Sequence, residues 1–544
     1  MKILWLDLNS SYAHSSLALP ALHAQMATND SFEWEIVSAT INENVGMVTN
    51  NIYHHHPDII AATNWLFNHE QLLHILSRAK ALLPYCRIAL GGPEFLGDNE
   101  DFLRKNPFVD CVFRGEGEEV FPQWLQYQNQ PEQWDTVTGL CYLDKKNLYH
   151  DNGIARVMNF VHLIPPEKSS FFNWSKPFVQ LETTRGCFNT CAFCVSGGEK
   201  PVRTLPIETI RERLMEIHRH GIKNVRVLDR TFNYNNKRAK ELLNLFLEFS
   251  PDICFHLEIH PALLSEELKK ELAGLPKGLL HLEAGIQSLR EPVLEQSRRM
   301  GRLSDALDGL KYLCSLHNME THADLIAGLP LYHLSEIFED IHTLAEYGAG
   351  EIQLESLKLL PGTEMRRRAE ELGIQYAPLP PYEVLQTREI SVDELQTALS
   401  RLLDGFYNTP TWQNITRTLM LENEHFLHHF LDHLMQIGLI DQPLSLEKRG
   451  LILYEFCKQN YPAYQTQVSI AWIEAGMSLK KLPAEKVKTK RQIPPETWIT
   501  IYGKYKETLR LCFLPANQEG QAGYWFGFES EIQKAEPVFK ALTM

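Results

Sequence analysis

Two arrays of short β-branched runs that alternate with amphipathic segments constrain the fold of this 544-residue chain more than any other feature. In the first 140 residues the strand-like runs are KILWLDL, DIIAAT, RIALGGPE and CVFRGEGEE. In the second array they are FVQLETT, NVRVLDR, CFHLEIH, LLHLEAGI, HADLIAGLP and EIQLESLKLLPG. Strands separated by helices predict parallel sheets. We therefore expect an α/β protein with a doubly wound N-terminal domain and a partial (β/α)6 barrel.

Changes in composition indicate where the domains end. We place the first domain at residues 1–140, a polar linker that contains a hairpin at 141–176, and the barrel at 177–386. A mostly helical extension at 387–544 follows, with the strand-like pieces TWITIYG and GYWFGFE near its end. The sequence does not indicate what this extension does.

Charge and hydropathy limit the classes of partner. The formal net charge of −15 argues against a broad basic face for nucleic acid. One basic run is interpreted as a solvated linker, with contact to RNA as the weaker alternative; it contains Lys480, Lys481, Lys486, Lys488, Lys490 and Arg491. No signal sequence and no run of about 18 apolar residues is present, so we expect a cytoplasmic protein without a membrane span.

Polar and glycine-rich loops follow the strands of the first domain. Ligands of open parallel sheets bind outside the carboxyl ends of the strands, and glycine lets the backbone approach them closely. The candidate ligand-binding residues in these loops are Ser10, Asn64, Trp65, Gly91, Gly92, Pro93, Glu94, Gly115 and Glu116. This open edge suits a large flat ligand.

Three cysteines, Cys187, Cys191 and Cys194, lie within eight positions directly after the first strand of the barrel. A structural zinc site needs a fourth ligand, and no second Cys-x2-Cys pair is present to supply it. Three thiolates on a [4Fe–4S] cluster leave one iron open for an exogenous ligand, which indicates catalysis. The seven isolated cysteines are interpreted as reduced core residues; they are Cys86, Cys111, Cys141, Cys254, Cys314, Cys457 and Cys512. The histidines at 54–56 and at 425–433 are interpreted as ordinary surface residues.

The Cys-x3-Cys-x2-Cys spacing, with Phe193 before the last cysteine and six βα units around it, resembles the radical S-adenosylmethionine (SAM) enzymes. The resemblance implies that SAM chelates the open iron and that an external donor supplies one electron. SAM is then cleaved to methionine and a 5′-deoxyadenosyl radical. The runs LEAGIQS, DLIAGLP and LKLLPGTEM are similar to later strands of that barrel. The residues thereby implied in SAM binding are Phe193, Glu283, Gln287, Ser288, Arg299, Ile326 and Gly328.

One segment departs from the family pattern. Where the family often has Gly-Gly-Glu after the second strand, this chain reads VLDRTFN. Asp229 or a backbone carbonyl is therefore assigned to the SAM amino group. Glu258 is expected to face the same site.

A doubly wound domain directly before such a barrel resembles the cobalamin-binding domain of cobalamin-dependent radical SAM enzymes. The Asp-x-His-x-x-Gly string that supplies an axial histidine elsewhere is absent from it. A nucleotide-binding or purely structural domain is the alternative. The resemblance implies an enzyme that uses a [4Fe–4S] cluster, SAM and cobalamin to methylate an unactivated carbon of a small molecule.

Three alternative functions remain open. The first is an enzyme with the same cofactors that cyclises, oxidises or rearranges its substrate without methylation. The second is a non-catalytic sensor of the cluster or corrinoid, and the third is an RNA-modifying enzyme.

Overall fold

The computed structural model describes residues 1–14, 16–27, 29–395, 399–439, 442–478, 481–482, 509–514, 524–529 and 539–543. The chain divides into two compact units, and we describe each by itself. The first comprises residues 1–334 and 356–395, and the second residues 335–355 and 396–544.

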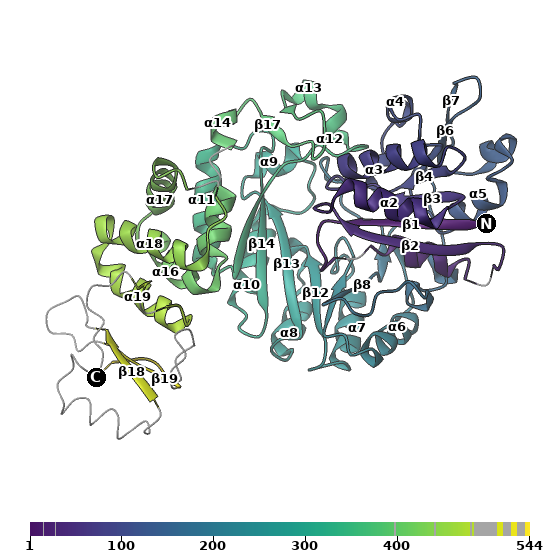
Figure 1. Cartoon of the computed structure of the whole chain (residues 1–544). Helices are drawn as coiled ribbons and strands as arrows, with labels where there is room; N and C mark the ends of the chain where they lie inside the picture. Colours follow the sequence, from purple (N-terminus) through teal and green to yellow (C-terminus); the bar gives the residue numbers. More distant parts are fainter. Residues whose placement is uncertain are drawn as a thin grey trace. The chain divides into compact units, whose positions relative to one another are not determined.

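The first sheet has the strand order β2-β1-β3-β4-β5-β6-β7 (Figure 1). Its parallel strands are β1 (Lys2–Asn9), β2 (Glu33–Thr40), β3 (Ile59–Thr63), β4 (Arg87–Gly91) and β5 (Cys111–Phe113). The strands β6 (Leu140–Leu143) and β7 (Tyr149–Asp151) extend it in antiparallel fashion. The predicted hairpin therefore belongs to this sheet, which continues past the expected boundary at residue 140.

Both faces of this sheet are covered by helices. Alternate residues of β1 point to opposite faces, so Leu4 and Leu6 pack in one core and Ile3 and Trp5 in the other. The first core includes α2 (Val45–His55), α3 (His69–Leu82) and α4 (Glu100–Lys105). The second includes α1 (Ala18–Ala24) and α5 (Val120–Tyr127). This is the doubly wound arrangement that the sequence predicts.

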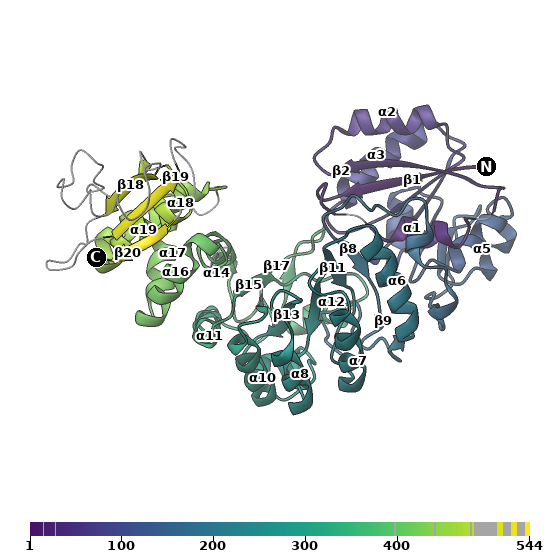
Figure 2. The same ribbon diagram turned by 90° about the horizontal axis from the view of Figure 1, so that it is seen from below.

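The second sheet has the order β15-β14-β13-β12-β11-β8. Its strands are β8 (Val179–Leu181), β11 (Asn224–Val227), β12 (Cys254–Ile259), β13 (Leu280–Gln287), β14 (Glu320–Ala327) and β15 (Glu351–Ser356). All six overlap the runs expected for the barrel. The connecting helices are α6 (Ile207–Arg219), α7 (Asn236–Leu247), α8 (Glu266–Gly274), α9 (Glu291–Gln296), α10 (Leu303–Ser315) and α11 (Leu334–Tyr347). Figure 2 shows α7, α8 and α10 along one side of the sheet.

A segment after the barrel strands completes the first unit. It contains α12 (Glu364–Arg367), α13 (Ala369–Leu372), the short strands β16 (Gln375–Tyr376) and β17 (Val384–Gln386), and α14 (Val392–Leu395). The buried hydroxyl of Tyr382 donates to the Glu94 carboxylate over 2.7 Å, and a Cβ on Gly97 would lie 3.1 Å from the Gly362 nitrogen. This segment therefore packs against the N-terminal domain.

The second unit is mostly helical, as expected for the extension. It contains α15 (Leu399–Leu402), a π-helical turn (Leu403–Tyr407), α16 (Pro410–Glu422), α17 (Phe426–Gln436), α18 (Leu446–Asn460) and α19 (Gln465–Glu474). An antiparallel sheet of β18 (Leu509–Leu514), β19 (Tyr524–Glu529) and β20 (Phe539–Thr543) follows. The division also assigns residues 335–355, with most of α11 and β15, to this unit.

Two sequence predictions concern residues of which the structure describes little. TWITIYG and most of the basic run lie outside the described residues, and the described Lys481 pairs with Glu447 over 2.6 Å. None of the helices in the described ranges is both long and apolar enough to span a bilayer.

Candidate active site

The three clustered cysteines lie on a loop whose two ends are joined. The loop runs from Gly186 to Val202, between β9 (Thr184–Arg185) and β10 (Arg203–Thr204), which pair antiparallel. Because β8 ends at Leu181, the loop begins at the carboxyl end of the first barrel strand, where barrel enzymes carry their chemistry. Cys187 and Cys191 are buried and Cys194 is half-buried.

Backbone hydrogen bonds and two glycines give this loop its shape. The Cys194 amide donates to the Cys191 carbonyl (3.1 Å), and the Gly197 amide donates to the Cys194 carbonyl (3.0 Å). A Cβ on Gly197 would lie 2.4 Å from the Cys191 carbonyl oxygen. Gly186 adopts φ +90°, and a Cβ there would lie 2.5 Å from the Glu199 oxygen. Glycine is therefore required on both sides of the cysteines.

The rest of the barrel supports the loop from the opposite side. The Ala192 amide donates to the Ser297 carbonyl (2.9 Å), and the Met365 amide donates to the Ala192 carbonyl (2.8 Å). One guanidinium nitrogen of Arg299 lies 3.7 Å from the Cys191 sulfur, and the other donates to the Gly285 carbonyl on β13. Arg299 was expected at the SAM site, and it lies beside a cysteine.

The charges around the thiols favour iron binding. Burial raises the pKa of Cys191 and of Cys194, and the positive charges of Arg299 and Arg230, respectively, oppose that rise. Thiolates are the form that binds iron, so the two cations support ligation. In the part of the chain that the structure describes, no three His, Cys, Asp or Glu side chains are grouped to hold a single metal ion. The thiolates of a cubane bind different irons, and these residues fit a [4Fe–4S] cluster.

A cavity of about 640 Å³ lies between the strand ends of the N-terminal domain and those of the barrel, both within the first unit. This volume is in the range of cofactor sites. The N-terminal domain contributes wall residues that include Trp5, Asn9, Ser10, Thr63, Trp65, Gly91, Gly92, Gly115, Glu116, Gly117 and Glu118. The barrel contributes Gln180, Glu182, Thr184, Arg185, Gly186, Ser196, Glu199, Leu228, Arg230 and Glu258.

Most of the residues predicted for cobalamin line this cavity, namely Ser10, Trp65, Gly91, Gly92, Gly115 and Glu116. Asn64, Pro93 and Glu94 do not belong to its wall. The Glu94 carboxylate binds the Tyr382 hydroxyl, and burial raises its pKa. Asn64 is fully buried and its Oδ1 has no hydrogen-bond partner. An unsatisfied polar atom directly before the wall residue Trp65, together with the glycine backbone, fits a large polar cofactor.

Asp229 does not line the cavity, although it was assigned to the SAM amino group. Its Oδ1 accepts the amides of Thr183 (2.8 Å) and Thr184 (2.9 Å), and its Oδ2 accepts the Thr183 hydroxyl. Asp229 is 1% exposed. It holds the backbone that leads from β8 into the cysteine loop, and a contact with SAM stays a prediction.

Glu258, at the end of β12, does line the cavity. Burial raises its pKa from 4.5 to about 7, while the positive charge of Arg230 opposes the rise. Arg230 also belongs to the wall. A carboxyl and a guanidinium group therefore face the space beside the cysteine loop.

Of the other predicted SAM residues, Gln287 and Ser288 lie at the end of β13, Ile326 and Gly328 at the end of β14, and Phe193 in the cysteine loop. A Cβ on Gly285 would lie 2.5 Å from the Gln287 side-chain nitrogen, and the Ser288 hydroxyl accepts the Arg290 amide. Gly328 adopts φ +87°, and a Cβ there would lie 3.3 Å from Val384. Phe193 and Ile326 are half-buried. Their roles in SAM binding stay predictions.

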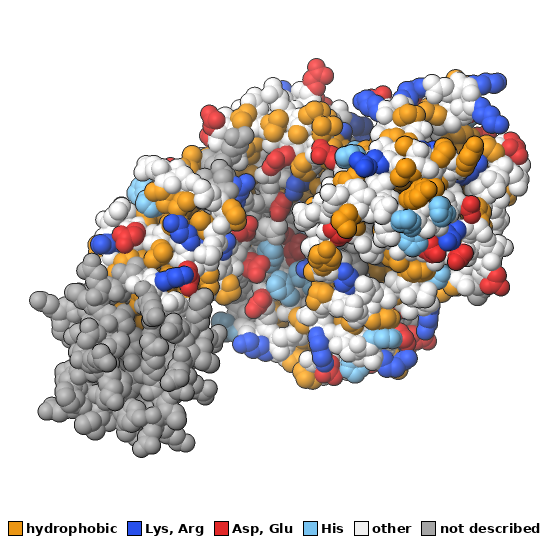
Figure 3. All heavy atoms as spheres, in the orientation of Figure 1, with side chains coloured by type: hydrophobic (Ala, Val, Ile, Leu, Met, Phe, Trp, Pro, Cys, Tyr) orange, Lys and Arg blue, Asp and Glu red, His pale blue; other side chains and the backbone are white. Residues whose placement is uncertain are grey.

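Sequence reasoning singled out Glu283 but missed the imidazoles and the Asp324 carboxylate that lie with it across β12 to β14. His256 hydrogen-bonds Glu283 over 2.8 Å, which lowers the pKa of Glu283, and stacks on His281 with ring centroids 4.8 Å apart. His322 pairs with Asp324 over 3.1 Å. Figure 3 shows acidic and histidine side chains on this face. The signal was present, since polar residues alternate with apolar ones in HLE, HLEAG and HAD.

Three family models match the chain. The model of the radical SAM superfamily matches residues 181–344, and that of the B12 binding domain matches residues 7–125. A third, described as a protein of unknown function (DUF4080), matches residues 370–539.

Curated proteins and solved structures are similar to the chain. An uncharacterized methyltransferase of Pyrococcus horikoshii is 23% identical over 65% of this chain and 79% of its own length. The cobalamin-dependent radical SAM methyltransferase TokK of Streptomyces tokunonensis is 21% identical over 59% of this chain. The match spans only 50% of TokK's length. The structure of the cobalamin-dependent SAM radical enzyme OxsB with aqua-cobalamin and SAM has a TM-score of 0.60 and 16% identity, covering 86% of this chain and 78% of OxsB.

Proposed function

Because this chain is a cobalamin-dependent radical SAM protein, we propose that it is an enzyme that methylates an unactivated carbon of a small molecule. The family matches confirm the predicted α/β fold class and the cofactor set of a [4Fe–4S] cluster, SAM and cobalamin. Methylation is supported by the similar proteins described above as methyltransferases. The cavity of about 640 Å³ that both domains line carries the proposal, because both cofactors then share one space with the substrate.

When bound, the cluster and SAM supply a 5′-deoxyadenosyl radical and cobalamin supplies the methyl group. Cys187, Cys191 and Cys194 would hold the iron, and the positive charges of Arg299 and Arg230 favour the thiolate forms of Cys191 and Cys194, respectively. The Gly91-Gly92 and Gly115 turns let the backbone approach the corrinoid.

We assign the carboxylate that receives the SAM ammonium group to Glu258, because it lines the cavity and both Asp229 oxygens are engaged elsewhere. Replacing Glu258 with Gln should weaken SAM binding to the cluster-loaded protein. Equilibrium binding of SAM measures this directly. Unchanged affinity would return the assignment to Asp229 or a backbone carbonyl.

The methyl transfer is tested with SAM that carries a deuterated methyl group. The protein, loaded with iron, sulfide and cobalamin, is incubated under a strong reductant with a metabolite extract. A product that gains the labelled methyl group only when cobalamin is present supports the proposal. Release of 5′-deoxyadenosine without labelled product would contradict methylation and favour a cyclase, an oxidase or a rearrangement enzyme.

The remaining alternatives are separated by the same preparation. A sensor would bind the cofactors without consuming SAM. An RNA-modifying enzyme would transfer the label to RNA, a reading that rested on the basic run around residues 480–491. The cytoplasmic location and the external electron donor stay predictions.

A further inference from the structure

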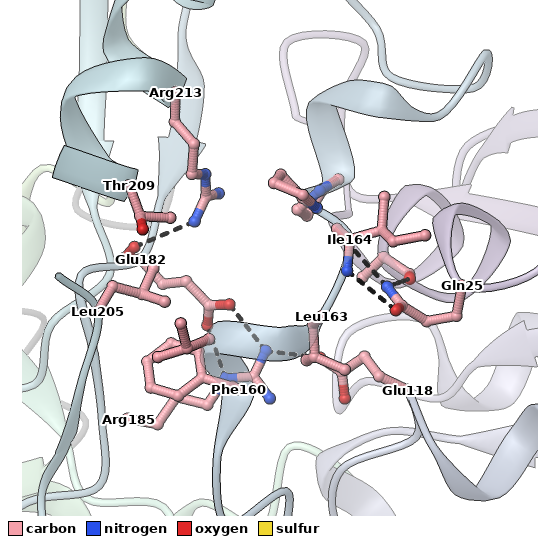
Figure 4. Close-up of a pocket in the computed structure, with 14 residues that line it drawn as sticks. Gln25, Glu118, Phe160, Leu163, Ile164, Glu182, Arg185, Leu205, Thr209 and Arg213 are labelled. Carbon is pink, nitrogen blue, oxygen red and sulfur yellow. Dashed lines mark hydrogen bonds and ion pairs between the residues drawn. The ribbon is translucent and has the colours of Figure 1, made fainter.

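Arg185 connects the cysteine loop to the N-terminal domain. It is separated from Cys187 only by Gly186, and its guanidinium group reaches across to the loop Gly115–Glu118. One nitrogen lies 2.6 Å from Glu118, and another 3.3 Å from Glu116. Glu182, at the end of β8, binds the same group over 2.7 Å. Figure 4 shows Arg185 between Glu182 and Glu118, with the ring of Phe160 alongside.

A second arginine makes a parallel connection on the other side of the loop. Arg203 lies opposite Arg185 in the β9–β10 pair. It binds Glu116 over 2.7 and 2.9 Å and Glu199 over 2.8 Å. The carbonyl of Glu199 accepts the Cys187 amide over 3.0 Å. Both flanks of Cys187 are therefore attached to the loop that carries Glu116.

The ion pairs of Arg185 and Arg203 are largely shielded from solvent. The side chains of Arg185 and Arg203 are 13% and 8% exposed. Burial acts to raise the pKa of Glu116, but the hydrogen bond from Arg203 and the charge of Arg185 outweigh it, so the carboxylate stays ionised. Removing one member of a buried ion network leaves the others uncompensated, which is more costly than losing a surface pair.

The network joins the two cofactor sites. Gly115, Glu116, Gly117 and Glu118 line the cavity on the N-terminal side, and Arg185 and Glu199 line it on the barrel side. We propose that Arg185 is a positioning residue that, with Glu116, fixes the separation between the cluster and the corrinoid. This inference rests on the proposed function, because it needs both cofactors to bind. Glu116 then acts through the arginines, whereas the sequence suggested that it contacts cobalamin directly.

The test measures the separation spectroscopically. Cobalamin in the Co(II) state and a reduced [4Fe–4S] cluster are both paramagnetic, so their dipolar coupling in frozen solution reports the distance between them. The wild type should give one narrow distance distribution. Arg185→Met should retain iron and cobalt but widen or shift the distribution by about 1 Å or more. Arg185→Lys keeps the positive charge but lacks the planar guanidinium fork. Its distance distribution should therefore be intermediate between those of the wild type and Arg185→Met.

Arg211→Met is the matched control, because Arg211 lies on α6 and pairs with the exposed Glu208 and Glu248. Its distribution should equal that of the wild type. An unchanged distribution in both Arg185 variants, with both cofactors loaded, would overturn the inference. If Arg185→Met loses a cofactor, the test rests on Arg185→Lys: a distance distribution that differs from the wild type supports the inference, and an unchanged one overturns it. A wild type that binds iron but no cobalt would instead refute the proposed function.

Discussion

Replacing Gly197 with Ala tests whether the shape of the cysteine loop determines cluster binding. The added Cβ would lie 3.0 Å from the Cys194 oxygen and 2.4 Å from the Cys191 oxygen, the latter about 1 Å short of ordinary contact. The backbone of two of the proposed iron ligands must move to relieve this overlap. Overpacking of this kind costs about 1–3 kcal/mol, which corresponds to roughly 5- to 150-fold weaker cluster retention.

The neighbouring Gly198 provides the control. It adopts φ +76° and nothing lies within 4 Å of its added Cβ, so Gly198→Ala adds about 1–2 kcal/mol of backbone strain without a clash. Both variants are loaded anaerobically, and the iron retained against a chelator is measured. Gly197→Ala should lose iron faster than both the wild type and Gly198→Ala. Equal retention in all three proteins would refute the reasoning.

Three further changes test the supporting contacts. Because the folded pKa of Glu258 is raised to about 7, its contribution to stability is present below about pH 4.5 and is lost as the pH rises through 7. As the pH rises from 5 to 8, the urea midpoint of unfolding of the wild type should therefore decrease relative to that of Glu258→Gln. Parallel pH dependences of the two midpoints would contradict this. Glu167→Ala should destabilise the protein by about 3–5 kcal/mol, because it leaves the buried Arg213 without its ion-pair partner. Glu248→Ala on the surface should cost less than about 1 kcal/mol. Equal urea midpoints of the two variants would refute this contrast. Asp229→Ala leaves two buried amides unpaired and should lower cluster retention while leaving cobalamin affinity unchanged, as iron and cobalt assays would show.

Local patterns in the sequence were sufficient to predict the strands and the position of the cysteines. Each barrel strand is a short alternating run, so its start and inward face could be read without tertiary information. The carboxyl ends of parallel strands meet at one edge, which is why Ser10, Gly91 and Gly115 were correctly grouped and now line one cavity.

Long-range pairings could not be predicted in this way. Glu116 and Arg203 are 87 residues apart in the sequence, and no periodicity links an acid in one loop to an arginine in another. Asp229 was assigned to SAM because it stands where the family often has Gly-Gly-Glu, and the sequence alone does not show that Thr183 and Thr184 donate hydrogen bonds to its oxygens. The hairpin of β6 and β7 was recognised, but its pairing with β5 depends on contacts that the local pattern does not contain.

Cofactor analysis of the wild type beside the Cys187→Ala, Cys191→Ala, Cys194→Ala triple variant tests the central claim most directly. After anaerobic loading, the account predicts about four irons and one cobalt per wild-type chain, with 5′-deoxyadenosine released from SAM under a strong reductant. The triple variant should lose the iron and all SAM cleavage and keep the cobalt. SAM cleavage by the triple variant, or a wild type without iron, would contradict the account.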